Sequence, residues 1–383
     1  MPAADEFQKP FCHPLFFLHI CDALLRIRSI SLFQFRNYSS RECHFTDRLV
    51  GFCGANGVGK TTLLDAIYYS CFTRSYFTKS DALLVQNGQK GFRLQTELEC
   101  QGKSHQLTVL LRENGKKEVY LDQELIPRLS QYVGKFPAVM VCPDDSRLIS
   151  GSSEERRTYL DVLFSQLDSE YLQQLVVYQK VMQQRNAFLK MVAHSGNYDA
   201  ILLDSFDDQL IRSGSQLYAK RNLYLQELIP AIRQHYQYIS GSAAAIDIDY
   251  QSALHQKEFA NILRNNRKKD LLLQRTEQGL HRDDLLFSWE GLPFKNTCSQ
   301  GQRKSLLFAC KLAEYDCLSA HKGFAPLLLL DDAFEKLDAQ RTDLLLQRVG
   351  EKKEGQVFLT DTHPQRIRDH FSQLKLGLQL IEL

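Results

Sequence analysis

Residues 49–69 read LVGFCGANGVGKTTLLDAIYY, and this stretch decides the fold. Its first five residues are mostly apolar and predict a buried strand, while residues 62–69 have helical character. Between them, residues 54–61 match the pattern G-x-x-x-x-G-K-[ST] in full. This pattern between a strand and a helix is typical of a phosphate-binding loop, and a chance glycine turn seldom satisfies every position. The stretch therefore predicts a nucleotide site.

Each residue type in this loop has a chemical role in binding phosphate. Glycine lets the backbone approach phosphate oxygens because no Cβ blocks the way. The loop amides and the N-terminus of the following helix then face the anion. We expect Lys60 to reach the β- and γ-phosphates of ATP as a catalytic residue, and the Thr61 hydroxyl to ligate Mg²⁺. The other predicted ATP-binding residues are Gly54, Ala55, Asn56, Gly57, Val58, Gly59 and Thr62.

A second apolar strand, predicted at residues 327–330, ends in two carboxylates, Asp331 and Asp332. We expect Asp331 to hold Mg²⁺ through its waters and Asp332 to orient or deprotonate the attacking water. A strand that ends in two acids is common alone, and its pairing with the phosphate-binding loop favours the functional interpretation. Because the two motifs lie far apart in the chain, a large insertion must separate the two halves of one core.

Residues 299–303, SQGQR, precede an apolar helix predicted over 305–312. A serine and a glycine at the start of a helix offer a hydroxyl and backbone amides to a phosphate. Alone, the segment is an ordinary helix cap. Its position shortly before the pair of aspartates is what distinguishes it.

The composition is that of a globular chain. Its 383 residues are 44% hydrophobic and 24% charged, enough for two or three domains. The formal net charge is only +2, so any nucleic-acid surface must be a local patch. None of the ten cysteines forms a C-x-x-C pattern, which favours buried thiols in a reducing cytosol. No apolar run reaches the ~18 residues that a membrane span needs, so we expect a cytoplasmic protein without a membrane partner.

The strands predicted outside the two motifs form a second group. Residues 26–35 predict a first strand, which a turn at 36–38 closes. Residues 92–100 alternate between apolar and polar side chains, and residues 106–111 and 118–121 predict two more short strands with a turn at 113–115 between them. These three strands suggest an antiparallel sheet beside the core. A further buried strand is predicted at 138–141. From residue 153 to about residue 238, apolar side chains recur at helical spacing.

We therefore predict an α/β fold in four segments. Residues 1–24 form an N-terminal tail, whose short apolar patch follows acidic residues and is not a signal peptide. Residues 25–150 form the N-terminal part of a P-loop ATPase head with the added antiparallel sheet. Residues 151–280 form an inserted helical lobe, and residues 281–383 form the C-terminal part of the head.

The order of these motifs resembles a known family. GANGVGKT, SQGQR, LLLLDD, the pair Leu337-Asp338 and a strand followed by residues 360–363 resemble the ABC-type ATPases of the SMC class. FRNY at 35–38, CPDDSRLISGSSEERRTYLD at 142–161 and HRDDL at 281–285 are similar to segments of the RecF family of bacterial recombination mediators. The resemblance covers residues 25–383 approximately. This chain departs from the family pattern at Leu280, where a proline is common, and at Glu335 and Lys336 before Asp338.

The resemblance implies an ATP-dependent homodimer in which the signature segment of one subunit contacts the ATP bound by the other. On this basis Ser299, Gly301 and Gln302 are signature residues that act in trans, and Asp338 belongs to a dimer-facing D-loop. His363 is implied as a switch residue, and Asp144 or Asp145 lies near the Q-loop position.

The resemblance also implies partners and a cellular role. DNA that is gapped, single-stranded or double-stranded would be bound, with weak DNA-stimulated ATPase activity. RecR- and RecO-like mediator proteins would help to load recombinase, and the SOS response would be supported. The candidates for DNA contact are basic residues, and those at 264–269 are slightly more typical of a solvated helix face than of a nucleic-acid contact. These candidates are Arg26, Arg28, Lys79, Arg264, Arg267, Lys268 and Lys269.

Two other functions use the same nucleotide chemistry. One is the ATPase subunit of an ABC transporter, against which stand the sequence SQGQR in place of LSGGQ and the large helical insertion. The other is a nucleotide-switched DNA scaffold with negligible turnover, which the paired aspartates argue against.

Overall fold

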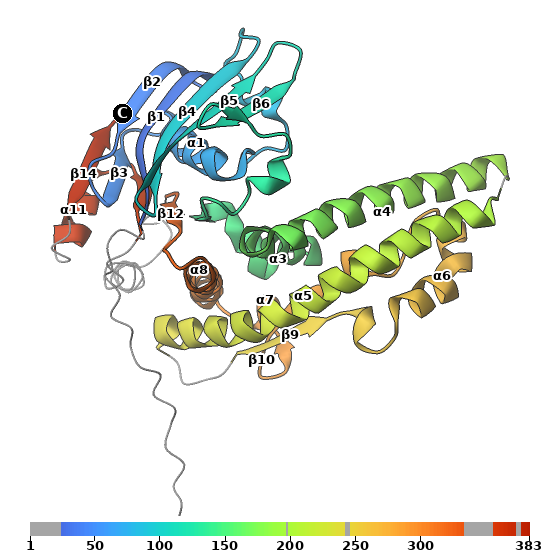
Figure 1. The fold of residues 1–383 in the computed structure, drawn as a ribbon. Helices are drawn as coiled ribbons and strands as arrows, with labels where there is room; N and C mark the ends of the chain where they lie inside the picture. Colours follow the sequence, from blue (N-terminus) through green and yellow to red (C-terminus); the bar gives the residue numbers. More distant parts are fainter. Residues whose placement is uncertain (1–23, 197, 242–245, 333–354, 373–376) are drawn as a thin grey trace, which may run out of the picture.

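A computed structural model describes residues 24–196, 198–241, 246–332, 355–372 and 377–383. A head of two sheets carries a long helical arm (Figure 1). The predicted N-terminal tail, apart from Leu24, and the D-loop residue Asp338 lie outside the described residues. None of the helices in these ranges has the length and hydropathy that a membrane crossing requires.

The core of the head is a five-stranded parallel sheet in the order β14-β3-β13-β12-β8. All residues of β3, β13, β12 and β8 are buried. This is expected for a parallel sheet that is covered on both faces. The sheet interleaves strands from both ends of the chain, which is the arrangement that the resemblance implied. The strands are β3 (Leu49–Cys53), β8 (Ala138–Val141), β12 (Leu327–Leu330), β13 (Val357–Asp361) and β14 (Leu378–Glu382).

The second sheet is antiparallel and larger than predicted, with the order β2-β1-β4-β5-β6-β7. The strict alternation of buried and exposed residues along β4 shows that one face packs on the core and the other faces solvent. Tyr38, expected to close a turn, instead begins β2, and this strand is polar at most positions, which hid it from the sequence pattern. The strands are β1 (Leu25–Phe35), β2 (Tyr38–His44), β4 (Phe92–Cys100), β5 (Lys103–Leu111), β6 (Lys117–Leu121) and β7 (Glu124–Leu125).

Helix α1 (Lys60–Phe72) lies between the two sheets. It is buried almost all round, and Leu63, Leu64 and Ile67 share one hydrophobic cluster with Leu94 of the antiparallel sheet and Leu329 of the parallel sheet. Such a helix is held by apolar contacts on every side. The N-terminus of α1, where the phosphate-binding loop ends, is therefore fixed by the core of the head.

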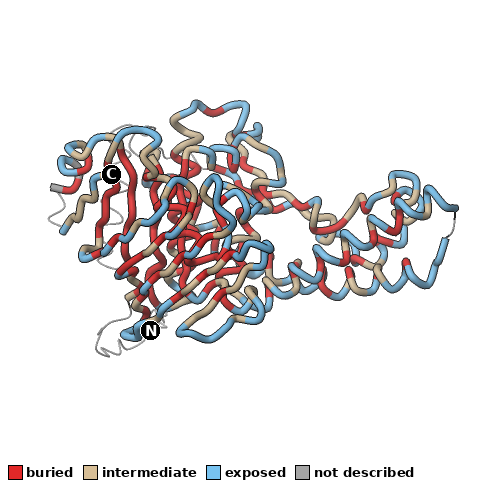
Figure 2. The backbone as a smooth tube through the Cα atoms, turned by 90° about the horizontal axis from the view of Figure 1, so that it is seen from above, coloured by how far each residue is buried: buried red, intermediate tan, exposed pale blue. Residues whose placement is uncertain are grey.

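The arm is built from α4 (Ser169–Ser195) and α5 (Ala200–Ser240), which run side by side away from the head (Figure 1). Figure 2 shows buried residues along the inner sides of these helices and exposed residues around them. The second half of α5 packs against α8 (Gln300–Lys322) of the head, and α6 (Phe259–Leu273) lies along α4 and α5. The arm and the head thus share one hydrophobic core.

A third, small sheet joins the predicted lobe to the following segment. β9 (Asp247–Gln251) lies inside the range 151–280, and it pairs with β10 (Asp284–Trp289) beyond that range. The predicted domain limits remain a prediction. The other helices and strands within the described residues are α3 (Ser153–Leu167), α2 (Arg147–Ser150), α7 (Phe294–Thr297), α11 (Pro364–Ser372), β11 (Leu292–Pro293) and the 3-10 helices η1 (Asp81–Leu84), η2 (Leu129–Gln131), η3 (Pro143–Ser146), η4 (Ala253–His255) and η5 (Leu280–Arg282).

Candidate functional site

The loop between β3 and α1 has the backbone geometry of a phosphate cradle. Gly57 and Gly59 have φ of 84° and 112°, a region that glycine adopts without the steric cost of a Cβ. The Lys60 ammonium donates to the carbonyl oxygens of Gly54 at 2.8 Å and Ala55 at 3.0 Å. The lysine is therefore held over the loop, where its charge faces any bound phosphate.

A cavity of about 360 Å³ opens over this loop. It collects residues from three segments that are distant in the sequence: the turn after β1, the phosphate-binding loop and the end of β12. Its position at the carboxyl ends of parallel strands is the usual place for a ligand in an α/β fold. The lining residues are Arg36, Asn37, Asn56, Gly57, Gly59, Lys60, Thr61, Thr62 and Asp332.

The predicted magnesium ligands lie side by side. The Thr61 hydroxyl donates to Asp331 Oδ1 at 2.9 Å. Thr360, at the end of the neighbouring strand β13, donates to the same oxygen at 2.9 Å. Asp331 is buried, which raises the pKa of its carboxyl, and the two threonine hydroxyls oppose that rise. The hydroxyl and carboxylate oxygens form a donor set that suits Mg²⁺. The sequence placed Thr360 in the segment 360–363 that carries the resemblance but gave it no role, because a threonine beside an aspartate carries no distinctive pattern.

Asp332 adopts a left-handed backbone conformation, with φ of 47°. This conformation is uncommon for a residue other than glycine, and such residues are frequent at functional sites. The Asp332 amide donates to Thr360 Oγ1 at 2.8 Å, and the residue lines the cavity. The His363 side chain is exposed, and His363 is not among the described residues that line the cavity.

The FRNY segment holds the phosphate-binding loop from the antiparallel sheet. Asn37 Nδ2 donates to the Val58 carbonyl at 3.1 Å, and the Tyr38 hydroxyl lies 3.4 Å from the same oxygen. Arg36 Nη2 donates to Asp65 Oδ2 at 2.9 Å. Asp65 is fully buried in the middle of α1, and burial raises the pKa of its carboxyl. The sequence identified the FRNY segment only by its resemblance to a family. In the structure, this segment contacts the Val58 carbonyl and so helps to position the phosphate-binding loop.

The signature segment begins helix α8 away from this cavity. Gln302 N donates to Ser299 Oγ at 3.2 Å, and Ser299 N donates to Gln302 Oε1 at 2.8 Å. This reciprocal pair is a capping box, so it fixes the start of the helix. Ser299 is exposed, and Ser299, Gly301 and Gln302 are not among the described lining residues of the cavity.

A second cavity, of about 530 Å³, lies beside Asp144 and Asp145. Lys311 of α8 places its ammonium 3.6 Å from both Asp145 Oδ2 and Glu314 Oε2. The Tyr76 hydroxyl also donates to Asp145. Burial raises the pKa of Glu314 to about 7, although the nearby Lys311 charge opposes that rise. The residues after β8 are thus tied to the helix that the signature segment begins.

This raised pKa predicts a pH-dependent stability. The ordinary pKa of Glu314 is 4.5, so between about 4.5 and 7 the folded state holds a proton that the unfolded state releases. The contribution to stability is complete below that range and is lost as pH rises through it. Glu314→Gln cannot ionise, and we expect its stability relative to wild type to improve by roughly 3 kcal/mol between pH 4.5 and 7. Urea unfolding at a series of pH values measures this difference, and a difference independent of pH would contradict it.

The predicted DNA residues do not form one patch. Arg28 pairs with Glu99 on the antiparallel sheet. Arg267 donates to Asp204 and Asp207 at 2.6 Å each, so this part of the basic cluster on α6 is neutralised within the arm. Lys269 lies 3.7 Å from Glu277. The remaining candidates are Arg26, half-buried on β1, exposed Lys79 beside the second cavity, and exposed Arg264 and Lys268 on α6.

The two sheets, the phosphate-binding loop and the paired aspartates define an ABC-type ATPase head. A family model described as the RecF/RecN/SMC N terminal domain matches residues 26–376, and the chain belongs to this family, in its RecF branch. It is 38% identical over 342 residues to the DNA replication and repair protein RecF of Flavobacterium johnsoniae, covering 89% of this chain and 95% of that protein. It is also 38% identical to the RecF protein of Cytophaga hutchinsonii, covering 89% of this chain and 90% of that protein.

Solved structures agree with this assignment. A structure of the recombination mediator protein RecF-ATPrS in the RecFOR pathway superposes with a TM-score of 0.85 at 25% identity, covering 95% of this chain and 98% of the other. A RecF-ATP structure gives 0.83 at 26% identity, covering 90% and 94%. The Smc head domain of Pyrococcus furiosus, at 13% identity over 92% of each chain and a TM-score of 0.53, shares the fold alone. The predicted fold class and family resemblance are confirmed.

Proposed function

We propose that this chain binds ATP with Mg²⁺ in the 360 Å³ cavity, dimerises when ATP is bound, and uses that cycle to bind DNA during recombinational repair. The observation that carries the proposal is the 2.9 Å hydrogen bond between Thr61 and Asp331. It brings the two halves of the nucleotide motif, from opposite ends of the chain, to one point. A phosphate-binding loop and a strand-end carboxylate in contact are the parts that phosphoryl-transfer sites of this kind need.

The residues take these roles in the proposal. The backbone at 54–59 and Thr62 cradle the phosphates, and Lys60 places its charge beside them. Thr61 and Asp331 would hold Mg²⁺, which supplies charge neutralisation of the phosphates when bound. Asp332, at the rim of the cavity, orients the attacking water and accepts its proton.

The position of the signature segment supports dimer formation. Ser299 is exposed on the surface of its own subunit, so a second subunit can bring Ser299, Gly301 and Gln302 to the phosphate. ATP favours the dimer only if it binds that state better, and contacts from both subunits to one nucleotide provide this difference. Asp338 and His363 are assigned to the same interface, as D-loop and switch residues. The division into residues 25–150, 151–280 and 281–383 belongs to the proposal too.

The names of the relatives support the choice of partners. They describe DNA replication and repair and a recombination mediator in the RecFOR pathway. We therefore assign gapped, single-stranded or double-stranded DNA and RecO- and RecR-like proteins as partners, in the cytoplasm, with a role in loading recombinase and in the SOS response. Phosphate contacts would dominate the DNA affinity, which should fall as salt rises. Weak ATPase activity that DNA stimulates completes the cycle.

The solution mass tests this proposal directly. The purified chain is measured without nucleotide, with ATP and Mg²⁺, and with ATP and gapped DNA. We expect a monomer that becomes a dimer only with ATP, because neither subunit completes the site alone. Asp332→Asn should hold the dimer longer, because hydrolysis is slowed while ATP binding is kept, and Ser299→Arg should prevent the dimer. A chain that stays monomeric in every condition would remove the shared site and leave a simple nucleotide binder.

A further inference from the structure

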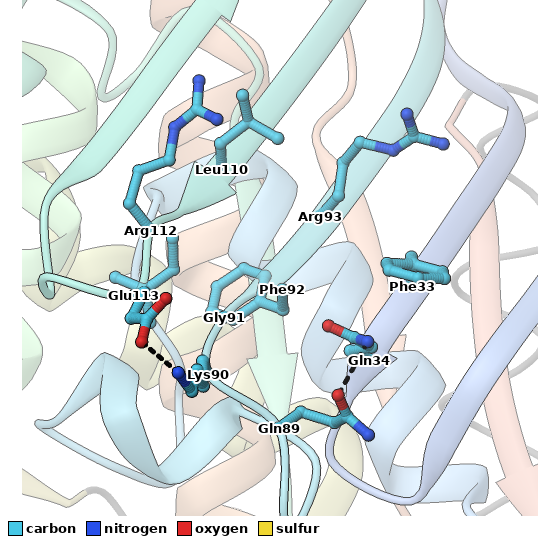
Figure 3. Close-up of a pocket in the computed structure, with 11 residues that line it drawn as sticks. Phe33, Gln34, Gln89, Lys90, Gly91, Phe92, Arg93, Leu110, Arg112 and Glu113 are labelled. Atoms are coloured by element: carbon cyan, nitrogen blue, oxygen red, sulfur yellow. Dashed lines mark hydrogen bonds and ion pairs between the residues drawn. The ribbon is translucent and has the colours of Figure 1, made fainter.

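The outer face of the antiparallel sheet carries an aromatic side chain beside a guanidinium. Phe33 on β1 is directly opposite Arg93 on β4, and Arg93 is opposite Leu110 on β5. Phe33 is 46% exposed, so part of its ring surface is open to solvent on the face of the sheet opposite the core. Figure 3 shows the Phe33 ring and the Arg93 side chain next to each other at the edge of a shallow groove. The groove has a volume of about 500 Å³.

The charges around this groove favour an anion. Three cationic side chains, Lys90, Arg93 and Arg112, line it against the single carboxylate of Glu113. Lys90 pairs with Glu113, and Arg112 pairs with Glu118. The Arg93 guanidinium is exposed and has no hydrogen bond or ion pair with any residue in the described part of the chain.

One acidic residue, Glu118 on β6, lies in the same row, opposite Leu110, and its carboxylate is paired with Arg112 and Lys116. Other acidic residues of this sheet face lie farther from the groove. Glu42 on β2 and Glu97 on β4 are both exposed, and the strand register places them beyond the row that contains Phe33 and Arg93. Their charges repel a polyanion, so they limit its contact to the end of the sheet nearest the phosphate-binding loop. The groove therefore combines one aromatic surface with one available cation over a small area.

We propose that this groove binds single-stranded DNA, with a base stacked on Phe33 and a neighbouring phosphate on Arg93. Single-strand binding proteins combine aromatic side chains, on which bases stack, with cations that follow the backbone. Bases inside a duplex are stacked on each other and cannot offer a face to Phe33. The half-buried Gln34 amide donates to Gln89 Oε1 at 2.9 Å at the margin, where these two amides can also meet a base edge.

An acidic peptide is the other occupant that this chemistry could accept, but the fold disfavours it. A peptide that binds a sheet usually adds a strand at a free edge. The groove lies over β1, β4 and β5, which are each paired on both sides. A peptide therefore cannot form backbone hydrogen bonds with these strands. A base can still stack on the exposed Phe33 ring, because stacking needs no free strand edge.

The groove is connected to the nucleotide site through a short piece of backbone. β1 runs from Phe33 through Gln34, which has φ of 54°, to the turn at Arg36 and Asn37, after which Tyr38 begins β2. The side chains of Asn37 and Tyr38 contact the Val58 carbonyl in the phosphate-binding loop. A base on Phe33 would thus stabilise the strand that positions the loop. This inference rests on the proposed function, and it assigns a site through which single strands stimulate ATP turnover.

The test measures the binding of fluorescein-labelled oligo(dT) and of a blunt duplex of equal length by anisotropy, with a slowly hydrolysed ATP analogue and Mg²⁺. Phe33→Ala should weaken oligo(dT) binding about tenfold, the loss expected for one stacked base. Phe33→Leu should lose as much, since it keeps apolar area without a ring, and Phe33→Tyr should retain wild-type affinity. Arg93→Ala should reduce the dependence of oligo(dT) binding on salt by about one phosphate contact. Duplex binding should stay unchanged in all four variants.

Leu125→Ala is the matched control, because Leu125 is an exposed apolar residue on edge strand β7 of the same sheet. It should bind both DNAs as wild type does. Wild-type affinity in Phe33→Ala would overturn the inference and leave the proposed function intact, as would equal losses for oligo(dT) and duplex. Full affinity in Phe33→Leu would also overturn it, since an apolar contact of the kind a peptide makes would then be enough. A wild-type chain that binds no DNA with nucleotide present would overturn the inference and the proposed function together.

Discussion

Gly59→Ala is expected to lower the affinity for ATP by roughly 100-fold or more. Gly59 has φ of 112°, and an L-residue held there costs on the order of 1–3 kcal/mol. A Cβ at this position would also lie 2.5 Å from Asn37 Nδ2 and 2.5 Å from the Tyr38 hydroxyl. Both atoms contact the loop itself, so crowding them adds about 1–3 kcal/mol. Every 1.4 kcal/mol corresponds to about a factor of ten, and calorimetric titration with ATP measures the loss.

The variant Gly57→Ala separates the cost of the backbone conformation from the cost of steric crowding. Gly57 has φ of 84° and belongs to the same loop, but a Cβ there would meet no atom within 4 Å. Gly57→Ala should therefore lower the affinity for ATP only about tenfold, the loss that the positive φ alone causes. Equal losses in the two variants would mean that Asn37 and Tyr38 do not restrict the loop. Both variants should also unfold at a lower temperature than wild type, and Gly59→Ala at the lowest, because the folded state carries the strain.

The main features of the head could be predicted because their causes are local. The apolar runs at 49–53 and 327–330 are buried parallel strands. The alternating run at 92–100 is a strand with one face exposed to solvent. The phosphate-binding loop could be predicted because its glycines and lysine are adjacent in the chain. In each case, the physical requirement acts within a few residues.

The features that could not be predicted depend on contacts between distant segments. The contact of Asn37 with the Val58 carbonyl joins a hairpin to a loop across two sheets. In the sequence, Arg267 is part of a basic run that is a candidate for DNA contact. In the structure, it forms ion pairs with Asp204 and Asp207 of another helix. No local pattern reports which acid a given arginine meets. Charge runs in a sequence therefore locate nucleic-acid surfaces poorly until the fold shows which cations are paired.

The HRDD segment gives the largest expected effect on stability, through Asp283. Its carboxylate is 1% exposed and accepts from Arg221 Nη1 of α5 at 3.0 Å. Arg221 is itself 2% exposed and also donates to Asp161 of α3 at 2.8 Å. The Tyr250 hydroxyl of β9 donates to the same Asp283 oxygen. Three elements, α3, α5 and β9, thus meet at the Asp283–Arg221 pair.

Asp283→Ala is expected to lower the free energy of unfolding by about 3–5 kcal/mol, because it leaves a buried guanidinium with half of its compensating charge. Urea unfolding followed by circular dichroism measures the loss. The double variant Asp283→Leu with Arg221→Met should be more stable than Asp283→Ala, since the buried guanidinium is then removed, and Asp161 is partly exposed and keeps the hydrogen bond from the Tyr171 hydroxyl.

Arg282→Ala is the control within the same segment, because Arg282 is exposed and pairs with Glu277 at the surface. It should change the free energy of unfolding by less than about 0.5 kcal/mol. A loss in Arg282→Ala that matches the loss in Asp283→Ala would contradict the buried-charge account. If only Asp283→Ala is destabilised, the HRDD segment stabilises the joint through its buried acid. We would then expect the arm to follow the head during the ATP cycle, because the Asp283–Arg221 pair joins β9 and α5 and, through Asp161, α3.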